Sequence, residues 1–199
     1  MSDKAKIAVL VSGGGTNLQA LIDAQKGGII SSGEIKLVIS NNEGAYALER
    51  AKKADIKAVV CNKKELGERF EDTLIELLER DNIDIIVLAG FMCILSEKFT
   101  SRFADRIINV HPSLIPSFCG KGFYGLKVHE AALAYGVKVT GATVHFVNEI
   151  PDGGKIIMQK AVCIKDDDTP ETLQRRVMEE AEWKILPLSV EKVSKDIKG

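Results

Sequence analysis

The stretch IAVLVSGGGTN, residues 7–17, joins a short continuous apolar run to a glycine-rich turn. An apolar run of this length is typical of a strand that is buried on both faces, as in a parallel sheet. The residues that follow, 17–26, carry Leu18, Leu21 and Ile22 at helical spacing. A strand, a glycine turn and a helix in this order predict the first unit of an α/β fold.

The same alternation of strand and helix patterns continues through the first half of the chain. Further strands are predicted at 35–40, 57–61 and 83–88, and further helices at 45–54 and 66–80. The run at 83–88 is the most apolar of these, so we expect it at the centre of the sheet. Together these segments predict an α/β fold with a doubly wound, Rossmann-like, mainly parallel sheet.

The pattern changes in the second half. Residues 107–110 form another predicted strand, and residues 127–134 a helix. The alternating segments 140–147 and 155–162 predict an antiparallel C-terminal extension of the sheet, and Thr169 opens a terminal helix. No linker or repeat divides the chain, so we expect a single domain over residues 1–199, with halves of about 1–105 and 106–199.

Composition narrows the class of protein. Hydrophobic residues make up 45% of the 199, enough for a sizeable core, and 27 Lys and Arg against 28 Asp and Glu give a net charge of -1. We therefore expect no nucleic-acid partner and no membrane partner. No apolar run approaches the roughly 20 residues of a membrane span. The four cysteines form no CxxC pair and no ligand cluster, which favours free thiols in the cytoplasm and no metal site.

The glycine turn at Ser12 to Asn17 suits a phosphate. Glycines let the backbone approach a ligand closely, and the start of the following helix offers unpaired N–H groups and a positive dipole end. The segment is neither a dinucleotide fingerprint nor a Walker loop. The alternative is a tight strand-to-helix turn without a ligand.

A second candidate site lies at the end of the strand at 107–110, in the sequence NVHPS. Asn109 and His111 are two residues apart, so their side chains point to the same face of an extended strand. An amide donor beside an imidazole can form an oxyanion site with an acid–base group next to it. The alternative is a capping Asn and a structural His.

Asp152 lies on a glycine-rich turn and can act as a partner for an imidazole, whose pKa its charge would raise. The alternative is a turn-forming residue. Of the other two histidines, His129 falls in an alanine-rich helix and is expected at the surface. His145 lies on an alternating strand and is expected to make a structural hydrogen bond.

Five segments of the chain resemble the phosphoribosylglycinamide formyltransferase family, which is folate-dependent. They are VLVSGGGTNLQ at 9–19, VLAGFM at 87–92, INVHPSLIP at 108–116, GATVHFV at 141–147 and DGG at 152–154. The resemblance covers almost the whole chain and implies the formyltransferase fold. It implies transfer of the formyl group of 10-formyltetrahydrofolate, a co-substrate, to the amine of N1-(5-phospho-β-D-ribosyl)glycinamide. The products would be formylglycinamide ribonucleotide and tetrahydrofolate, a step of purine (IMP) biosynthesis that needs no metal.

The resemblance also implies site residues. The catalytic trio would be Asn109, His111 and Asp152. The first half would hold the ribonucleotide phosphate, and the residues implied in ribonucleotide binding are Gly15, Thr16, Asn17 and Glu182. The second half would carry the chemistry and bind folate. The residues implied at the folate pocket are Met92, Cys93, Ile94, Leu95, Asn109, Asn148, Glu149, Ile150, Pro151 and Asp152.

The chain departs from the family pattern in four places. Cys93 and Gly67 stand where arginines are common, and those arginines would face the carboxylates of the folate tail. We therefore predict a weaker dependence on the glutamate tail than in relatives that keep both. The stretch at 117–125 is longer and more basic than is usual. Around 177–183 the terminal helix carries one residue more than in some relatives.

Three other interpretations each explain part of this pattern. A formyltetrahydrofolate deformylase-like hydrolase shares the glycine loop and the trio, but normally has a further domain ahead of it. Methionyl-tRNA formyltransferase shares the trio but carries a further basic domain after it. A non-catalytic nucleotide- or folate-binding module would explain the loop but not the trio. Both a monomer and a homodimer are compatible with the sequence.

Overall fold

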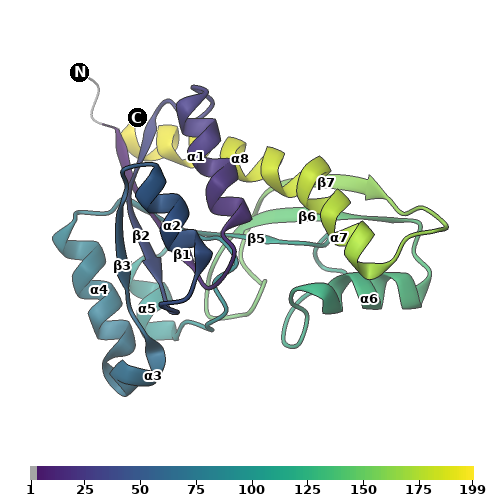
Figure 1. Ribbon diagram of the computed structural model, residues 1–199, viewed down its shortest axis with the longest axis horizontal. Coiled ribbons are helices and arrows are strands. Elements are labelled where there is room, and N and C mark those ends of the chain that lie inside the picture. The colour runs from purple at the N-terminus through teal and green to yellow at the C-terminus, as the bar shows by residue number, and fades with distance from the viewer. Residues whose placement is uncertain (1–3) are drawn as a thin grey trace.

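The computed structural model describes residues 4–199 and has a single seven-stranded sheet at its centre (Figure 1). Its order is β3-β2-β1-β4-β5-β6-β7. The strands from β3 to β5 run parallel, whereas β6 and β7 are antiparallel additions. The strands are β1 (Ala5–Val11), β2 (Gly33–Ser40), β3 (Lys57–Val60), β4 (Ile85–Leu88), β5 (Ile107–His111), β6 (Val139–Phe146) and β7 (Ile156–Cys163). The predicted sheet and its antiparallel extension are confirmed, with β4 at the centre. Residues 1–3, which the single-domain prediction includes, lie outside the described residues.

Helices cover both faces of the sheet. They are α1 (Thr16–Lys26), α2 (Tyr46–Lys53), α3 (Lys63–Leu66), α4 (Phe70–Arg80), α5 (Glu97–Arg102), α6 (Leu126–Tyr135), α7 (Pro170–Val177) and α8 (Trp183–Lys198). One core cluster joins α1, α2, α7 and α8 to the sheet, and the other joins α4 and α5 to its opposite face. On β1, Ile7 and Val9 enter the first cluster, whereas Ala8 and Leu10 enter the second. This alternation is the physical basis of the doubly wound arrangement.

The single helix predicted at 66–80 is wrong at its start. Asn62 caps the short helix α3 by accepting the N–H of Lys64 at 3.0 Å, and the turn η1 (Gly67–Arg69) separates α3 from α4. Gly67 has φ +55°, in the left-handed region that breaks an α-helix. The helix α5 was not predicted; its N-cap is Ser96, which accepts the N–H of Phe99.

The terminal helix begins as predicted. Thr169 caps it, and Thr169 and Thr172 form a reciprocal capping box. Between α7 and α8 lies one π-helical turn, η2 (Met178–Glu182). A π turn takes up one extra residue within a helix, and this turn falls inside the stretch expected to be one residue longer.

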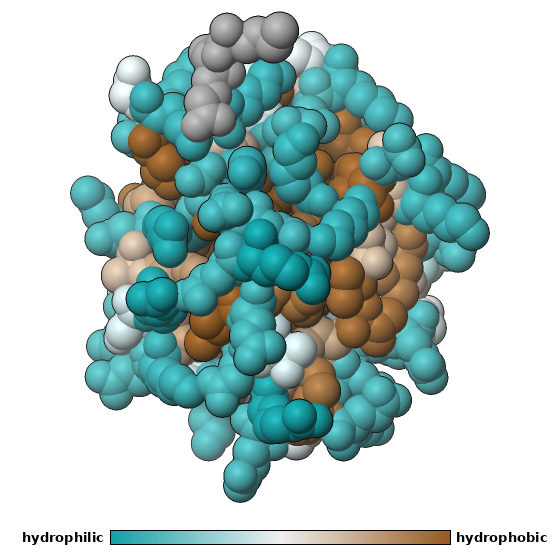
Figure 2. Space-filling view, turned by 90° about the vertical axis from the view of Figure 1, so that its left-hand side faces the viewer, coloured by the Kyte–Doolittle hydropathy of each residue, from teal (hydrophilic) through white to brown (hydrophobic). Residues whose placement is uncertain are grey.

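The surface is hydrophilic over most of the face seen in Figure 2, with smaller apolar areas between the polar side chains. Over residues 4–199, no helix has both the length and the apolar character to span a bilayer. In the same residues all four cysteines have free thiols, of which only Cys61 is fully buried.

Candidate active site

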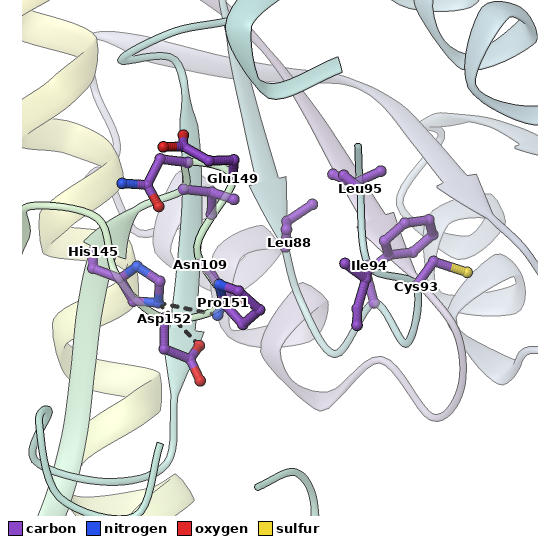
Figure 3. Close-up of a pocket in the computed structure, with 12 residues that line it drawn as sticks. Leu88, Cys93, Ile94, Leu95, Asn109, His145, Glu149, Pro151 and Asp152 are labelled. Atoms are coloured by element: carbon purple, nitrogen blue, oxygen red, sulfur yellow. Dashed lines mark hydrogen bonds and ion pairs between the residues drawn. The ribbon is translucent and has the colours of Figure 1, made fainter. Parts of the chain in front are cut away.

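An open cleft of about 130 Å³ lies at the carboxyl end of β4 and over one face of β5 and β6. Ligands of open α/β sheets bind in this region, beyond the carboxyl ends of parallel strands. Figure 3 shows apolar Leu88, Ile94 and Leu95 on one side of the cleft, and Asn109, His145 and Asp152 on the other.

The cleft brings together most of the residues expected at a folate pocket. Those that line it are Cys93, Ile94, Leu95, Asn109, Asn148, Glu149, Pro151 and Asp152. Met92 and Ile150 do not line it; their side chains are exposed. Four lining residues were not predicted there, namely Leu88, Phe91, His145 and Val147.

Asn109 and His111 lie on the same face of β5, as predicted from their spacing. The residues between and before them, Val110 and Ile108, pack into the core on the opposite face. The His111 side chain is buried, with Nε2 2.8 Å from the carbonyl oxygen of Phe118 and Nδ1 3.5 Å from Asp152 Oδ2. Since a carbonyl only accepts, Nε2 carries a proton, and Nδ1 is the basic atom, next to the carboxylate.

Burial determines the protonation of His111. It lowers the pKa of the imidazole, while the charge of Asp152 and the hydrogen bond to Phe118 raise it, and the net direction is downward. The expected effect of Asp152 is therefore present, but burial outweighs it in the protein without ligands, so the net shift favours the neutral imidazole.

Asp152 is held as an anion. Burial raises its pKa, but the contact with the His145 imidazole, the charge of His111 and the N–H of Gly120 lower it, and the net direction is downward. The Gly120 N–H donates to Oδ2 at 2.8 Å. His145 Nε2 lies 3.5 Å from Oδ1, so the carboxylate is placed between two imidazoles.

The other two histidines match the predictions only in part. His145 makes a backbone hydrogen bond, as predicted, from Nδ1 to the Phe146 carbonyl at 2.7 Å, but it also lines the cleft. His129 is fully buried, so its expected place at the surface is wrong. It shares the inner face of α6 with Val128 and Ala132, and burial lowers its pKa to about 4. The helical spacing of Val128 and Ala132, both apolar, is the sequence signal that could have placed His129 on the inner face of α6.

The glycine turn has the form expected of an anion site. Gly15 begins α1 with φ +70°, and a Cβ there would lie 2.6 Å from Ala47 Cβ. No described side chain caps α1, so N–H groups of its first turn have no side-chain acceptor. Arg50 was not predicted; its Nε donates to the Gly14 carbonyl at 2.8 Å, which places a cation beside the turn.

Two hydrogen bonds tie the glycine turn to distant segments. Asn17 Nδ2 donates to Glu182 Oε2 at 2.8 Å, across 165 residues, and burial raises the pKa of Glu182 to about 6. The N–H of Met92 donates to Ser12 Oγ at 2.8 Å, which links the turn to the edge of the cleft. Neither Ser12 nor its partner has a sequence signal for this role.

Comparison with known proteins identifies the family. The formyl transferase family model matches residues 5–190. Over 187 residues the chain is 45% identical to the phosphoribosylglycinamide formyltransferase of Haemophilus influenzae, covering 93% of this chain and 85% of that protein. The chain belongs to the formyl transferase family. It is also 48% identical over 193 residues to the trifunctional purine biosynthetic protein adenosine-3 of Homo sapiens, covering 96% of this chain and 18% of that protein. The chain thus spans less than a fifth of the length of such relatives.

Solved structures of the family have the same fold. Glycinamide ribonucleotide transformylase 1 from Symbiobacterium toebii superposes with a TM-score of 0.90 at 39% identity, covering 97% of this chain and 89% of that one. The phosphoribosylglycinamide formyltransferase from Coxiella burnetii gives 0.89 at 41%, covering 98% and 89%. The predicted resemblance and fold class are confirmed. These relatives carry transferase names, which supports the main interpretation and not the hydrolase alternative.

A second open cavity, of about 510 Å³, adjoins the cleft at Cys93 and is also lined by Lys63 and Lys64. The Cys93 thiol accepts a hydrogen bond from Asn41 Nδ2 at 3.0 Å. Among residues 4–199, no group of three or more His, Cys, Asp or Glu side chains forms a candidate metal site. A metal-free reaction stays a prediction.

Proposed function

We propose that the chain transfers the formyl group of 10-formyltetrahydrofolate to the amine of N1-(5-phospho-β-D-ribosyl)glycinamide. The products are formylglycinamide ribonucleotide and tetrahydrofolate, in the purine branch that leads to IMP. The observation that carries the proposal is the cluster of Asn109 and Asp152, which line the cleft, with the buried His111 in contact with Asp152 behind them, in a member of the formyl transferase family.

The ribonucleotide is assigned to the glycine turn. Gly15, Thr16 and Asn17 offer the start of α1 to the phosphate, and Arg50 adds a positive charge. Glu182 is a buried carboxylate next to Asn17, well suited to accept hydrogen bonds from ribose hydroxyls.

The formyl-folate is assigned to the cleft. Its apolar side, with Leu88, Ile94 and Leu95, suits the faces of a flat heteroaromatic ring. Asn148 and Glu149 bring polar groups to the rim, as the polar edge of such a ring requires. Ile150 has an exposed apolar side chain and stands between Glu149 and Pro151, which line the cleft, so it is placed to cover a bound ring.

The reaction forms an N–C bond between the glycinamide amine and the formyl carbon. Negative charge develops on the formyl oxygen, and Asn109 donates an N–H to it. The amine nitrogen becomes positive and must lose a proton. In the protein without ligands His111 is shifted toward its neutral form, so Nδ1 can take that proton.

The ionised Asp152 then stabilises the imidazolium at 3.5 Å. His111 passes the proton to the leaving nitrogen of the folate, the C–N bond breaks, and tetrahydrofolate leaves. One proton moves from amine to folate, and His111 returns to its starting state.

The test is a spectrophotometric assay with 10-formyltetrahydrofolate, run with and without the ribonucleotide. We expect turnover that requires the ribonucleotide and is lost in His111→Ala. Release of folate without the ribonucleotide would overturn the proposal and indicate the deformylase-like hydrolase.

We further propose that one domain performs both tasks, with residues of about 1–105 binding the ribonucleotide phosphate and 106–199 carrying the chemistry. Both parts contribute to the cleft and to the Asn17–Glu182 contact.

A cytoplasmic location is proposed, although a relative from Arabidopsis thaliana is named as chloroplastic. The partners are the two substrates, with no nucleic acid and no membrane, and the protein is a monomer or a homodimer.

A further inference from the structure

His145 touches two members of the predicted catalytic trio, although the sequence pointed only to a structural hydrogen bond. Its buried imidazole places Nε2 3.2 Å from Asn109 Nδ2 and 3.5 Å from Asp152 Oδ1. Figure 3 shows the three side chains converging at one end of the cleft.

The position of the proton on His145 follows from its other contact. Nδ1 lies 2.7 Å from the Phe146 carbonyl oxygen, which can only accept, so Nδ1 carries a proton. A neutral imidazole protonated at Nδ1 has its lone pair on Nε2, and this lone pair faces the amide nitrogen of Asn109. One of the two Asn109 N–H bonds therefore donates to His145, and the second is left for another acceptor.

We propose that His145 is a positioning residue that fixes the orientation of the Asn109 amide, so that its second N–H meets the oxyanion of formyl transfer. An Asn amide turned by 180° has nearly the same shape but exchanges its nitrogen and oxygen. The turned amide would present an oxygen to a developing negative charge, which repels instead of stabilising it. The proposal rests on the proposed function.

The sheet itself places these two side chains together. Asn109 and His145 are direct partners in the antiparallel pair β5–β6. Next to this position the register of β6–β7 shifts, because β7 has one additional residue between the partners of Val144 and His145. Irregularities of this kind re-aim a side chain and occur beside active sites.

The opposite assignment makes a different prediction. An imidazole protonated at Nε2 would donate to Asp152 and would face Asn109 with an N–H. Asn109 would then have to turn its oxygen toward His145, away from its role as a donor. The location of the proton on His145 therefore decides between the two orientations.

The first experiment is a double-mutant cycle on kcat. We expect His145→Phe to lower kcat by about 10- to 100-fold with the KM of both substrates changed by less than about threefold, since the donor is disordered and not removed. In an Asn109→Ala background the same change should lower kcat by less than about threefold. In a Glu182→Gln background, which affects a different part of the site, it should keep its full effect. An equal loss in all backgrounds would overturn the proposal.

The second experiment needs no turnover. Nitrogen-15 NMR of the wild-type imidazoles at pH 7.5 reports which ring nitrogen carries the proton, and the resonance lost in His145→Phe or in the milder His145→Gln assigns it. A proton on Nδ1 alone is the expected result, and a proton on Nε2 would overturn the proposal. If the wild type shows no ribonucleotide-dependent turnover, the proposed function fails, and this measurement still tests the hydrogen-bond assignment by itself.

Discussion

Replacing Glu182 by Gln should stabilise the protein and impair it at the same time. The carboxylate is buried, and burial raises its pKa from 4.5 to about 6. The folded protein therefore binds a proton at the Glu182 carboxyl more tightly than the unfolded chain does. The free energy of unfolding falls as the pH rises from about 4.5 to 6, because Glu182 becomes charged in its buried position. Above pH 6 the full cost of the buried charge is present.

The size of the effect follows from the pKa change. A rise of about 1.5 corresponds to about 2 kcal/mol at pH 7.5. Glu182→Gln keeps an oxygen that can accept from Asn17 but carries no charge. We expect it to gain up to about 2 kcal/mol in the free energy of unfolding at pH 7.5, and less than about 0.5 kcal/mol at pH 4.5.

Urea unfolding at the two pH values measures this difference, and Glu180→Gln, at an exposed position of the same turn, is the matched control. In the transfer assay, Glu182→Gln should raise the KM of the ribonucleotide by about 10- to 100-fold, since hydrogen bonds to a charged acceptor contribute about 1.5–3 kcal/mol. A stability gain that does not change with pH would refute the reasoning, because it could not come from a buried charge.

Three further outcomes are expected. Gly15→Ala introduces a Cβ at positive φ and 2.6 Å from the Cβ of Ala47, so we expect it to lower the free energy of unfolding in urea by about 2–4 kcal/mol. Gly14→Ala, whose Cβ would have no atom within 4 Å, should lower it by less than about 1 kcal/mol. Similar losses for the two would contradict the strain argument. Asp152→Asn should lower kcat by about 100-fold or more and move the acidic limb of the pH–rate profile to lower pH, because it removes a charge that raises the pKa of His111; a profile of unchanged shape would reject this mechanism. Deleting the glutamate tail of the co-substrate should reduce affinity less than it does in relatives with both tail arginines, and an equal fold-loss would speak against it.

Local signals in the sequence were enough for most of the fold. The apolar run of β1, the glycine turn and the helical spacing of α1 are adjacent in the chain, so their meaning depends on no distant residue. The same holds for the Thr169 capping box. The break at Gly67 is also local, but glycine adopts negative and positive φ about equally readily, so its presence in a helical pattern does not reveal the φ of +55°.

The site was predicted less completely because its chemistry depends on contacts between distant segments. His145 meets Asn109 across 36 residues, through the register of two strands. The direction of the His111 pKa depends on burial, and the presence of a carboxylate far away in the sequence says nothing about how much of the imidazole is covered. Residue types and the family resemblance predict the trio, but the direction of the His111 pKa depends on how the site packs.

The π turn at Met178–Glu182 links the fold to the site. Along the terminal helix the buried side chains recur at Leu173 and Val177, then at the adjacent pair Ala181 and Glu182, and then at Ile185 and Leu186. The step from Val177 to Ala181 is the four residues of an α-helix and the step from Val177 to Glu182 is five, the spacing of a π turn, so that two adjacent side chains face inward here. Without the π turn, one residue more in this segment would rotate everything after it by about 100° and carry the inner face of α8 out of the core. The π turn absorbs that residue, keeps both helical faces buried, and places a carboxylate inward within 2.8 Å of Asn17. The irregular turn is thus the means by which the last helix brings a carboxyl group to Asn17, beside the glycine turn, without losing its packing.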